Sequence, residues 1–266
     1  MSTNANSDIP RDLMARYLVA LADDELVLGH RDSEWTGHGP ILEEDIAFSN
    51  IAQDELGHAL ALFTIAAELG GMSPDTMAFG RPWQDFRCCR FVEYPKGDFA
   101  YTVVRQFFFD AAEQVRMKSH EQSSFEPLRD VSAKILAEEG YHLMHSRGLF
   151  ERLGDSTDES RRRMQEAVSL AFPQALGLFE EMDGEQDLVR AGAVSASRVL
   201  QHAWLNDVVP VVSGVGLAAP VRKGSEGYML DCSPEEGGRK GNHTAELALL
   251  VQDLQQVYQS VPGAKW

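Results

Sequence analysis

The sequence is short of positive charge. Its 266 residues include 24 Lys and Arg against 41 Asp and Glu, which gives a formal net charge of −17 at pH 7. Such a surface repels phosphate backbones and anionic lipids, so we expect neither nucleic acid nor membrane as a partner. A run of about 18 apolar residues is also missing, so we expect no transmembrane helix. Residues 1–10 are polar and lack the apolar centre of a signal peptide.

Cysteine is scarce as well. The three cysteines are an odd number, and Cys88 and Cys89 are neighbours that are poorly placed to bridge each other, while Cys232 stands apart. We therefore expect reduced thiols and a cytoplasmic protein. The sequence contains no glycine-rich nucleotide fingerprint, phosphate loop or Ser/His/Asp elbow. We expect no nucleotide cofactor on this chain, and electrons for oxygen chemistry would come from another protein.

What the sequence does contain is the pattern Glu-x-x-His, twice. Glu55 and His58 form the first copy, and Glu139 and His142 form the second copy 84 residues later. Positions i and i+3 share a face of an α-helix, so each pair directs one carboxylate and one imidazole toward the same point. Ferritin-like helical bundles bind two metal ions with two such pairs and one further carboxylate from each of two other helices.

Two upstream acids have the spacing that this scheme requires. Glu25 lies 30 residues before Glu55, and Asp110 lies 29 residues before Glu139, as for antiparallel helices that meet at mid-length. Glu113 shares a helix face with Asp110 and is an alternative ligand, although the spacing favours Asp110. Carboxylate-rich sites accept iron or manganese, so we predict a di-iron or di-manganese site. The predicted ligands are Glu25, Glu55, His58, Asp110, Glu139 and His142.

The neighbours of these acids are apolar. Glu55 lies among Ile51, Ala52 and Leu56, and Asp110 directly follows three phenylalanines. A buried unpaired carboxylate is costly, and metal coordination explains several of them together.

Another acid stands directly before each motif. For Asp54 and Glu138 we predict that each reaches the distal N–H of the facing histidine and fixes its tautomer. The alternative for both is a solvent-facing acid beside a core residue.

Helical periodicity extends over nearly the whole chain, which predicts an all-α protein with one ferritin-like domain over residues 1–266. The expected bundle helices are residues 12–30, 42–69, 98–121 and 127–153, the second stopped by Gly70-Gly71. Residues 72–95 form a long connection with three prolines, which suggests a crossover. We expect flanking helices at 158–183 and 191–208, an irregular arm at 209–242, and a C-terminal helix and tail at 243–266.

Several longer stretches resemble the PaaC-type subunit of ring-1,2-phenylacetyl-CoA epoxidase. The resemblance runs nearly end to end. It is carried by Asp24-Glu25-Leu26, residues 29–37, Leu42-Glu43-Glu44-Asp45-Ile46-Ala47, Asn50-Ile51-Ala52, Tyr141-His142-Leu143, Arg152-Leu153-Gly154 and the ending Pro262-Gly263-Ala264-Lys265-Trp266.

The resemblance implies a ferritin-like subunit that pairs with a homologous catalytic di-iron subunit in a monooxygenase of aerobic phenylacetate breakdown. It further implies a reductase, a small accessory subunit, and a CoA-ester substrate, with one oxygen atom of O2 inserted across an aromatic ring bond. Many PaaC-type proteins have lost the ligands and act as structural partners, whereas this chain keeps all six. A non-catalytic structural partner and a stand-alone ferritin-like oxidase or iron-storage protein are the alternatives.

Overall fold

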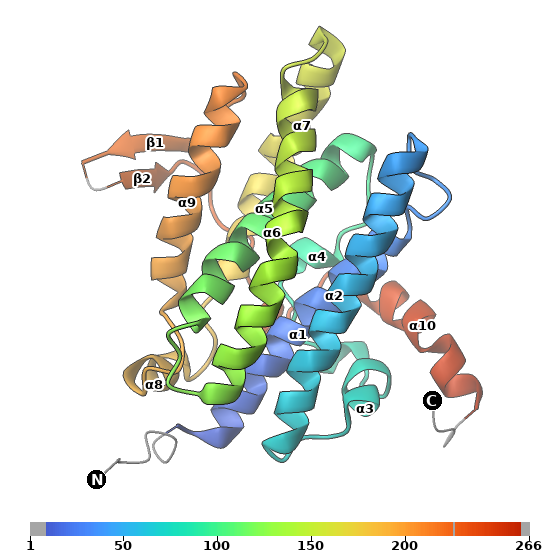
Figure 1. Cartoon of the computed structure of the whole chain (residues 1–266), viewed down its shortest axis with the longest axis vertical. Helices are drawn as coiled ribbons and strands as arrows, with labels where there is room; N and C mark the ends of the chain where they lie inside the picture. Colours follow the sequence, from blue (N-terminus) through green and yellow to red (C-terminus); the bar gives the residue numbers. More distant parts are fainter. Residues whose placement is uncertain (1–8, 226, 262–266) are drawn as a thin grey trace. The chain divides into compact units, whose positions relative to one another are not determined.

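The computed structural model describes residues 9–225 and 227–261, which are predominantly helical (Figure 1). The chain divides into two compact units. Unit 1 includes Lys96–Glu236, and unit 2 joins Pro10–Pro95 to the C-terminal segment that begins at Gly237. A single domain over the whole chain therefore stays a prediction. Among the described helices, none combines the length and the apolar character needed to span a lipid bilayer.

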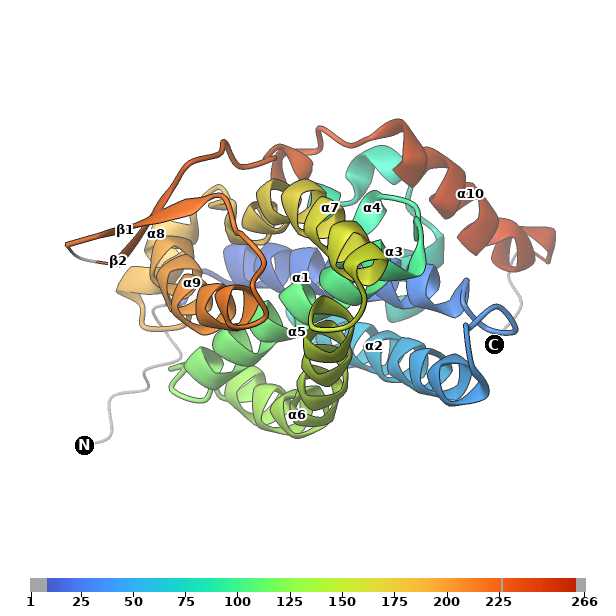
Figure 2. The ribbon, with the colours of Figure 1, turned by 90° about the horizontal axis from the view of Figure 1, so that it is seen from above.

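Two long helices, α1 (Arg11–Ser33) and α2 (Leu42–Glu68), form the core of unit 2 and lie side by side (Figures 1 and 2). Their bounds agree with the expected helices within three residues. Gly29 permits the close approach, because a Cβ atom there would lie only 3.1 Å from the backbone oxygen of Ala52 and from Cβ of Glu55. Past the end of α2, Gly70 has φ +108°, a conformation that glycine tolerates, so the expected helix stop is confirmed.

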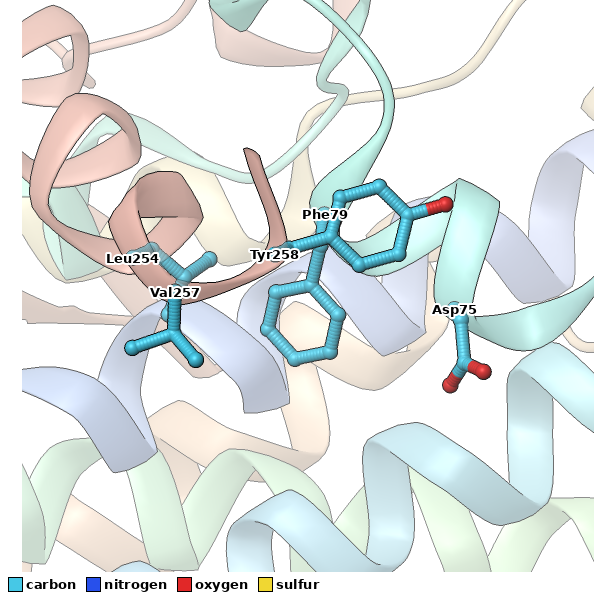
Figure 3. Close-up of a pocket in the computed structure, with 5 residues that line it drawn as sticks. All are labelled: Asp75, Phe79, Leu254, Val257 and Tyr258. Carbon is cyan, nitrogen blue, oxygen red and sulfur yellow. The ribbon is translucent and has the colours of Figure 1, made fainter. Parts of the chain in front are cut away.

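The rest of unit 2 consists of short elements and one more helix. The expected connection contains α3 (Pro74–Phe79), the 3-10 helix η2 (Trp83–Asp85) and α4 (Arg90–Glu93), and the C-terminal segment contributes η4 (Gly238–Lys240) and α10 (Ala245–Ser260). The tail after residue 261 lies outside the described residues. Helix α10 packs on α3 and leaves a shallow, mostly apolar groove of about 240 Å³ (Figure 3).

Unit 1 is built on α5 (Phe99–His120) and α6 (Glu126–Gly154), which lie side by side (Figures 1 and 2). Asp98 caps α5 by accepting a hydrogen bond from the backbone N–H of Tyr101 at 2.9 Å. Helices α7 (Asp158–Ala175) and α9 (Ser197–Gly214) pack against α5. The indole N–H of Trp204 donates to the carbonyl of Phe108 at 2.9 Å, so this part of the core has a fixed register.

Three expected boundaries in unit 1 are wrong. Helix α7 ends at Ala175 and continues as the 3-10 helix η3 (Leu176–Phe179), and a short α8 (Glu185–Arg190) precedes α9. The expected arm is partly regular, because α9 continues through Pro210 to Gly214 and an antiparallel hairpin, β1 (Val221–Gly224) and β2 (Gly227–Leu230), follows. The cost of an internal proline is offset by four buried valines at 208, 209, 211 and 212.

Candidate metal centre

Three of the predicted ligands meet in unit 2. Glu25 on α1 and Glu55 and His58 on α2 each offer a ligand atom, and these atoms lie within 4.8 Å of one another. Nδ1 of His58 is 3.5 Å from Oε2 of Glu55 and 3.7 Å from Oε2 of Glu25. All three side chains are buried, with at most 3% exposed. We call these residues the unit 2 half-site.

The unit 2 half-site concentrates buried acidic groups. Among the residues that the structure describes, neither carboxylate oxygen of Glu25 has a hydrogen-bond partner. Burial, and then the charge of Glu55, raise the pKa of Glu25 from 4.5 to about 8. Burial by itself would lower the pKa of His58, but Glu25 and Glu55 outweigh it and raise this pKa to about 12. In the metal-free chain, a proton on His58 therefore balances the negative charge of the nearby carboxylates. A bound metal ion would take over this role.

The donor set of the unit 2 half-site suits a metal of the iron or manganese type. It offers two carboxylates and one imidazole from adjacent helix faces, and both ligand types bind these metals. A buried carboxylate without a hydrogen bond requires an explanation, because such a group is costly in a protein interior. Coordination of a metal ion by Glu25 would supply that explanation.

The other three predicted ligands lie in unit 1. Asp110 is on α5, and Glu139 and His142 are on α6, where Nδ1 of His142 is 3.0 Å from Oε1 of Glu139. All three are buried. The hydroxyl of Ser146 donates to Oδ2 of Asp110 at 2.6 Å. Since residues 142 and 146 share a helix face, Asp110 lies against the ligand face of α6. We call Asp110, Glu139 and His142 the unit 1 half-site.

The two candidate carboxylates of α5, Asp110 and Glu113, have different bonding partners. Oδ1 of Asp110 accepts a bond from Nε2 of Gln106 at 2.7 Å, so Gln106 and Ser146 orient this carboxylate from both sides. Glu113 instead pairs with Arg116, whose guanidinium also donates to the carbonyl of Leu178 at 2.9 Å. Because Arg116 already balances the charge of Glu113, Asp110 stays the predicted ligand.

Sequence reasoning missed Gln106 and Ser146. A signal was present, because Gln106 lies four residues before Asp110 and Ser146 lies four residues after His142.

The acids before the two motifs are less buried than the ligands. Asp54 and Glu138 are both half-buried on the helices that carry Glu55 and Glu139. Their contact with a facing histidine stays a prediction.

A third group of ligand-type residues lies elsewhere in unit 2. Atoms of Cys88, Glu93 and His243 lie within 4.8 Å of one another. Both ring nitrogens of His243 are engaged, Nδ1 with Glu93 at 2.6 Å and Nε2 with the carbonyl of Phe86 at 2.8 Å. Glu93 also accepts from the backbone of Thr244, and burial raises the pKa of the Cys88 thiol. These satisfied bonds indicate a structural network rather than a metal site.

The groove between α3 and α10 is no catalytic candidate. The rings of Phe79 and Tyr258 lie against each other there with centroids 6.0 Å apart, beside Leu254 and Val257 (Figure 3). Of the described residues that line it, Asp75 alone carries a carboxylate, so these residues do not form a set of metal ligands.

Comparisons with known proteins agree with this arrangement of helices. A solved structure, protein 19 with aldehyde deformylating oxidase activity from Synechococcus, is similar with a TM-score of 0.52 and 16% identity, over 78% of this chain and 88% of that chain. At this identity the likeness concerns the fold. It supports the all-α, ferritin-like fold that the paired motifs predict.

Two curated relatives come from Escherichia coli (strain K12). The PaaC subunit of 1,2-phenylacetyl-CoA epoxidase is 35% identical over 95% of this chain and 99% of that protein. The PaaA subunit of the same enzyme is 24% identical over 80% of this chain and 70% of that protein. The family model described as phenylacetic acid catabolic protein matches residues 1–266. With a full-length match and this helical fold, the chain belongs to the phenylacetic acid catabolic protein family.

Proposed function

We propose that this chain is a subunit of a 1,2-phenylacetyl-CoA epoxidase complex and that its two half-sites together hold one di-metal centre. The activity is supported by the similarity to two subunits of that enzyme. The metal centre is supported above all by the unit 2 half-site, in which a buried Glu25, without hydrogen bonds to the described residues, faces Glu55 and His58.

Each side chain has a role in this proposal. The residues that would hold the two metal ions are Glu25, Glu55, His58, Asp110, Glu139 and His142. When bound, two iron ions supply the reduction of O2 and the transfer of one oxygen atom to the aromatic ring of the CoA ester. Gln106 and Ser146 hold Asp110 in place, and Asp54 and Glu138 orient the histidines.

The complex has further members in this proposal. A homologous protein of the PaaA type is the partner, because this chain is similar to both PaaC and PaaA. A reductase and a small accessory protein complete the complex. The reductase is needed because the sequence of this chain has no motif for a nucleotide cofactor that could supply electrons.

The metal content of the purified chain is the first test. We expect two iron or manganese ions per chain by elemental analysis. Anomalous scattering from crystals should locate the pair about 3.5–4 Å apart. A wild-type chain that binds no metal after reconstitution with Fe(II) would contradict the metal centre and leave a non-catalytic structural partner.

The second test separates a catalytic from a structural role. In the reconstituted complex, Glu55→Ala removes a proposed metal ligand and should lower phenylacetyl-CoA-dependent oxygen consumption by about 100-fold or more, with assembly unchanged. Glu43→Ala is the matched control, because Glu43 is an exposed acid on the same helix. Full turnover in Glu55→Ala would place the chemistry in the partner protein. Turnover by the chain alone would instead favour a stand-alone oxidase.

A further inference from the structure

Helix α1 carries three acids in a row that are all buried. Asp23, Asp24 and Glu25 are each at most 1% exposed. Successive residues of an α-helix point about 100° apart, so the three carboxylates leave α1 in three directions. Charged side chains are rarely buried unless they are paired, so each of the three requires a partner.

Two of the acids have a dedicated arginine. Asp23 pairs with the guanidinium of Arg81 and accepts from the backbone N–H of Arg87 at 2.8 Å. Asp24 pairs with both terminal nitrogens of Arg239, one of them at 3.0 Å, and accepts from the backbone N–H of Cys89 at 2.7 Å.

The third acid is different. Within the described part of the chain, neither oxygen of Glu25 has a hydrogen bond, and its side chain faces Glu55 and His58, with Oε2 3.7 Å from Nδ1 of His58. The two arginines thus leave Glu25 as the one acid of the three that can still bind a cation.

Glycines bring Arg239 to Asp24. A Cβ atom on Gly238 would lie 2.2 Å from the carbonyl oxygen of Cys88, so only glycine lets the chain pass there. Gly237 and Gly241, with φ +126° and +77°, form the turns on either side. Arg239 also donates to the carbonyl of Ala20 at 2.9 Å, one turn before Asp24 on α1. The segment therefore attaches to α1 at two successive turns.

We propose that Arg239 is a positioning residue for Glu25. Its bonds to Asp24 and to Ala20 fix the rotation of α1 about its own axis, and this rotation directs Glu25 toward His58 and Glu55. Arg239 also balances the charge of Asp24, so that Glu25 alone of the three acids presents its charge to a metal ion. The inference rests on the proposed function, in which Glu25 is a metal ligand.

The test is a Co(II) titration of the full chain, followed by the visible absorption spectrum of the bound ion. Arg239→Met should weaken Co(II) binding about tenfold or more and change the spectrum, because the ligand geometry changes. Arg239→Lys keeps the charge but loses the bidentate hydrogen bond to Asp24, so its affinity for Co(II) should lie between those of Arg239→Met and the wild type.

Arg31→Met is the control. Arg31 is a buried arginine that lies six residues after Glu25 on the same helix. Its guanidinium donates a hydrogen bond to the carbonyl of Glu93. It should lower the melting temperature while the affinity and spectrum stay as in the wild type.

The outcomes separate the two proposals. A wild-type chain that binds no Co(II) overturns both. Wild-type affinity and spectrum in Arg239→Met overturn only the positioning role, as does an equal loss of affinity in Arg31→Met. Should Arg239→Met fail to fold, Arg239→Lys decides, and wild-type affinity and spectrum in that variant overturn the proposal.

Discussion

The two half-sites carry the same Glu-x-x-His motif but differ in what surrounds the upstream acid. In the unit 2 half-site, Glu25 is buried without a hydrogen bond to any described residue, and His58 lies near two carboxylates. In the unit 1 half-site, Asp110 accepts hydrogen bonds from Gln106 and Ser146. The two half-sites thus share the same ligand spacing. They differ in that Asp110 accepts hydrogen bonds, whereas Glu25 accepts none from the described residues.

In the proposed metal centre, this difference corresponds to two ways of preparing a ligand for metal binding. Hydrogen bonds hold Asp110 in one orientation before any cation arrives, which reduces the ordering needed on binding. Burial of Glu25 without a hydrogen bond to the described residues instead lowers the stability of the folded state. Binding of a cation to Glu25 would offset this loss of stability. We therefore expect metal binding to stabilise unit 2 more than unit 1.

The largest expected effect concerns pH. A metal ion must displace the proton of His58, whose pKa is raised to about 12, and that of Glu25, whose pKa is raised to about 8. Between pH 6 and pH 8 the affinity for Co(II) should therefore rise about tenfold to a hundredfold per pH unit. Titrations at several pH values measure this slope. Glu25→Gln should reduce the slope by about one proton, and a flat profile would contradict the prediction.

The same shifts set the stability of the metal-free chain. The raised pKa of Glu25 means that the folded state holds more protons than the unfolded state between about pH 4.5 and pH 8. The raised pKa of His58 acts in the same direction from about pH 6.5 upward. Stability should therefore fall as pH rises from 6 to 8 in the presence of a chelator, as urea unfolding at the two pH values would show.

Metal removal should have the next largest effect. A metal ion present at about 100 times its dissociation constant stabilises the fold by about 3 kcal/mol, which corresponds to roughly 10 °C in melting temperature for a chain of this size. Calorimetry with and without a chelator measures the change. Hydrogen exchange should show most of the lost protection in α1 and α2, and an equal loss in α5 and α6 would refute the contrast between the half-sites.

The choice of ligand on α5 comes next. Asp110→Asn should weaken metal binding about 100-fold, since it removes a charged ligand. Glu113→Gln should leave metal binding within about threefold, because Glu113 is paired with Arg116. Isothermal titration of both variants with Co(II) compares them, and the reverse order of affinities would identify Glu113 as the ligand.

The smallest effect distinguishes the half-sites without any metal. At pH 8.5, Glu25→Gln should raise the stability of the metal-free chain by about 1 kcal/mol, because it removes a buried charge that lacks hydrogen bonds. Asp110→Asn should lower it by about 1–2 kcal/mol, since one of its two hydrogen bonds loses its acceptor. Urea unfolding in the presence of a chelator measures both, and shifts of the same sign would remove the distinction.

The sequence by itself determined the long helices and the ligand candidates. Apolar residues at intervals of three and four define α1, α2, α5 and α6 to within three residues, because helix periodicity is a local property of the chain. The spacing of Glu55 and His58 places both on one helix face for the same reason. Gly70 marks the end of α2 through its own conformational preference.

Only the tertiary structure decided which of these acids have partners. Asp23, Asp24 and Glu25 are equivalent in sequence, and their different environments depend on Arg81, Arg239 and His58, which come from distant segments. Asp110 likewise accepts a hydrogen bond from Ser146 on another helix. Glu113 differs, because its partner Arg116 lies one turn further along the same helix, where the sequence already places it. Local pattern specifies where a side chain leaves its helix, whereas pairing inside a protein depends on which other segment is packed there.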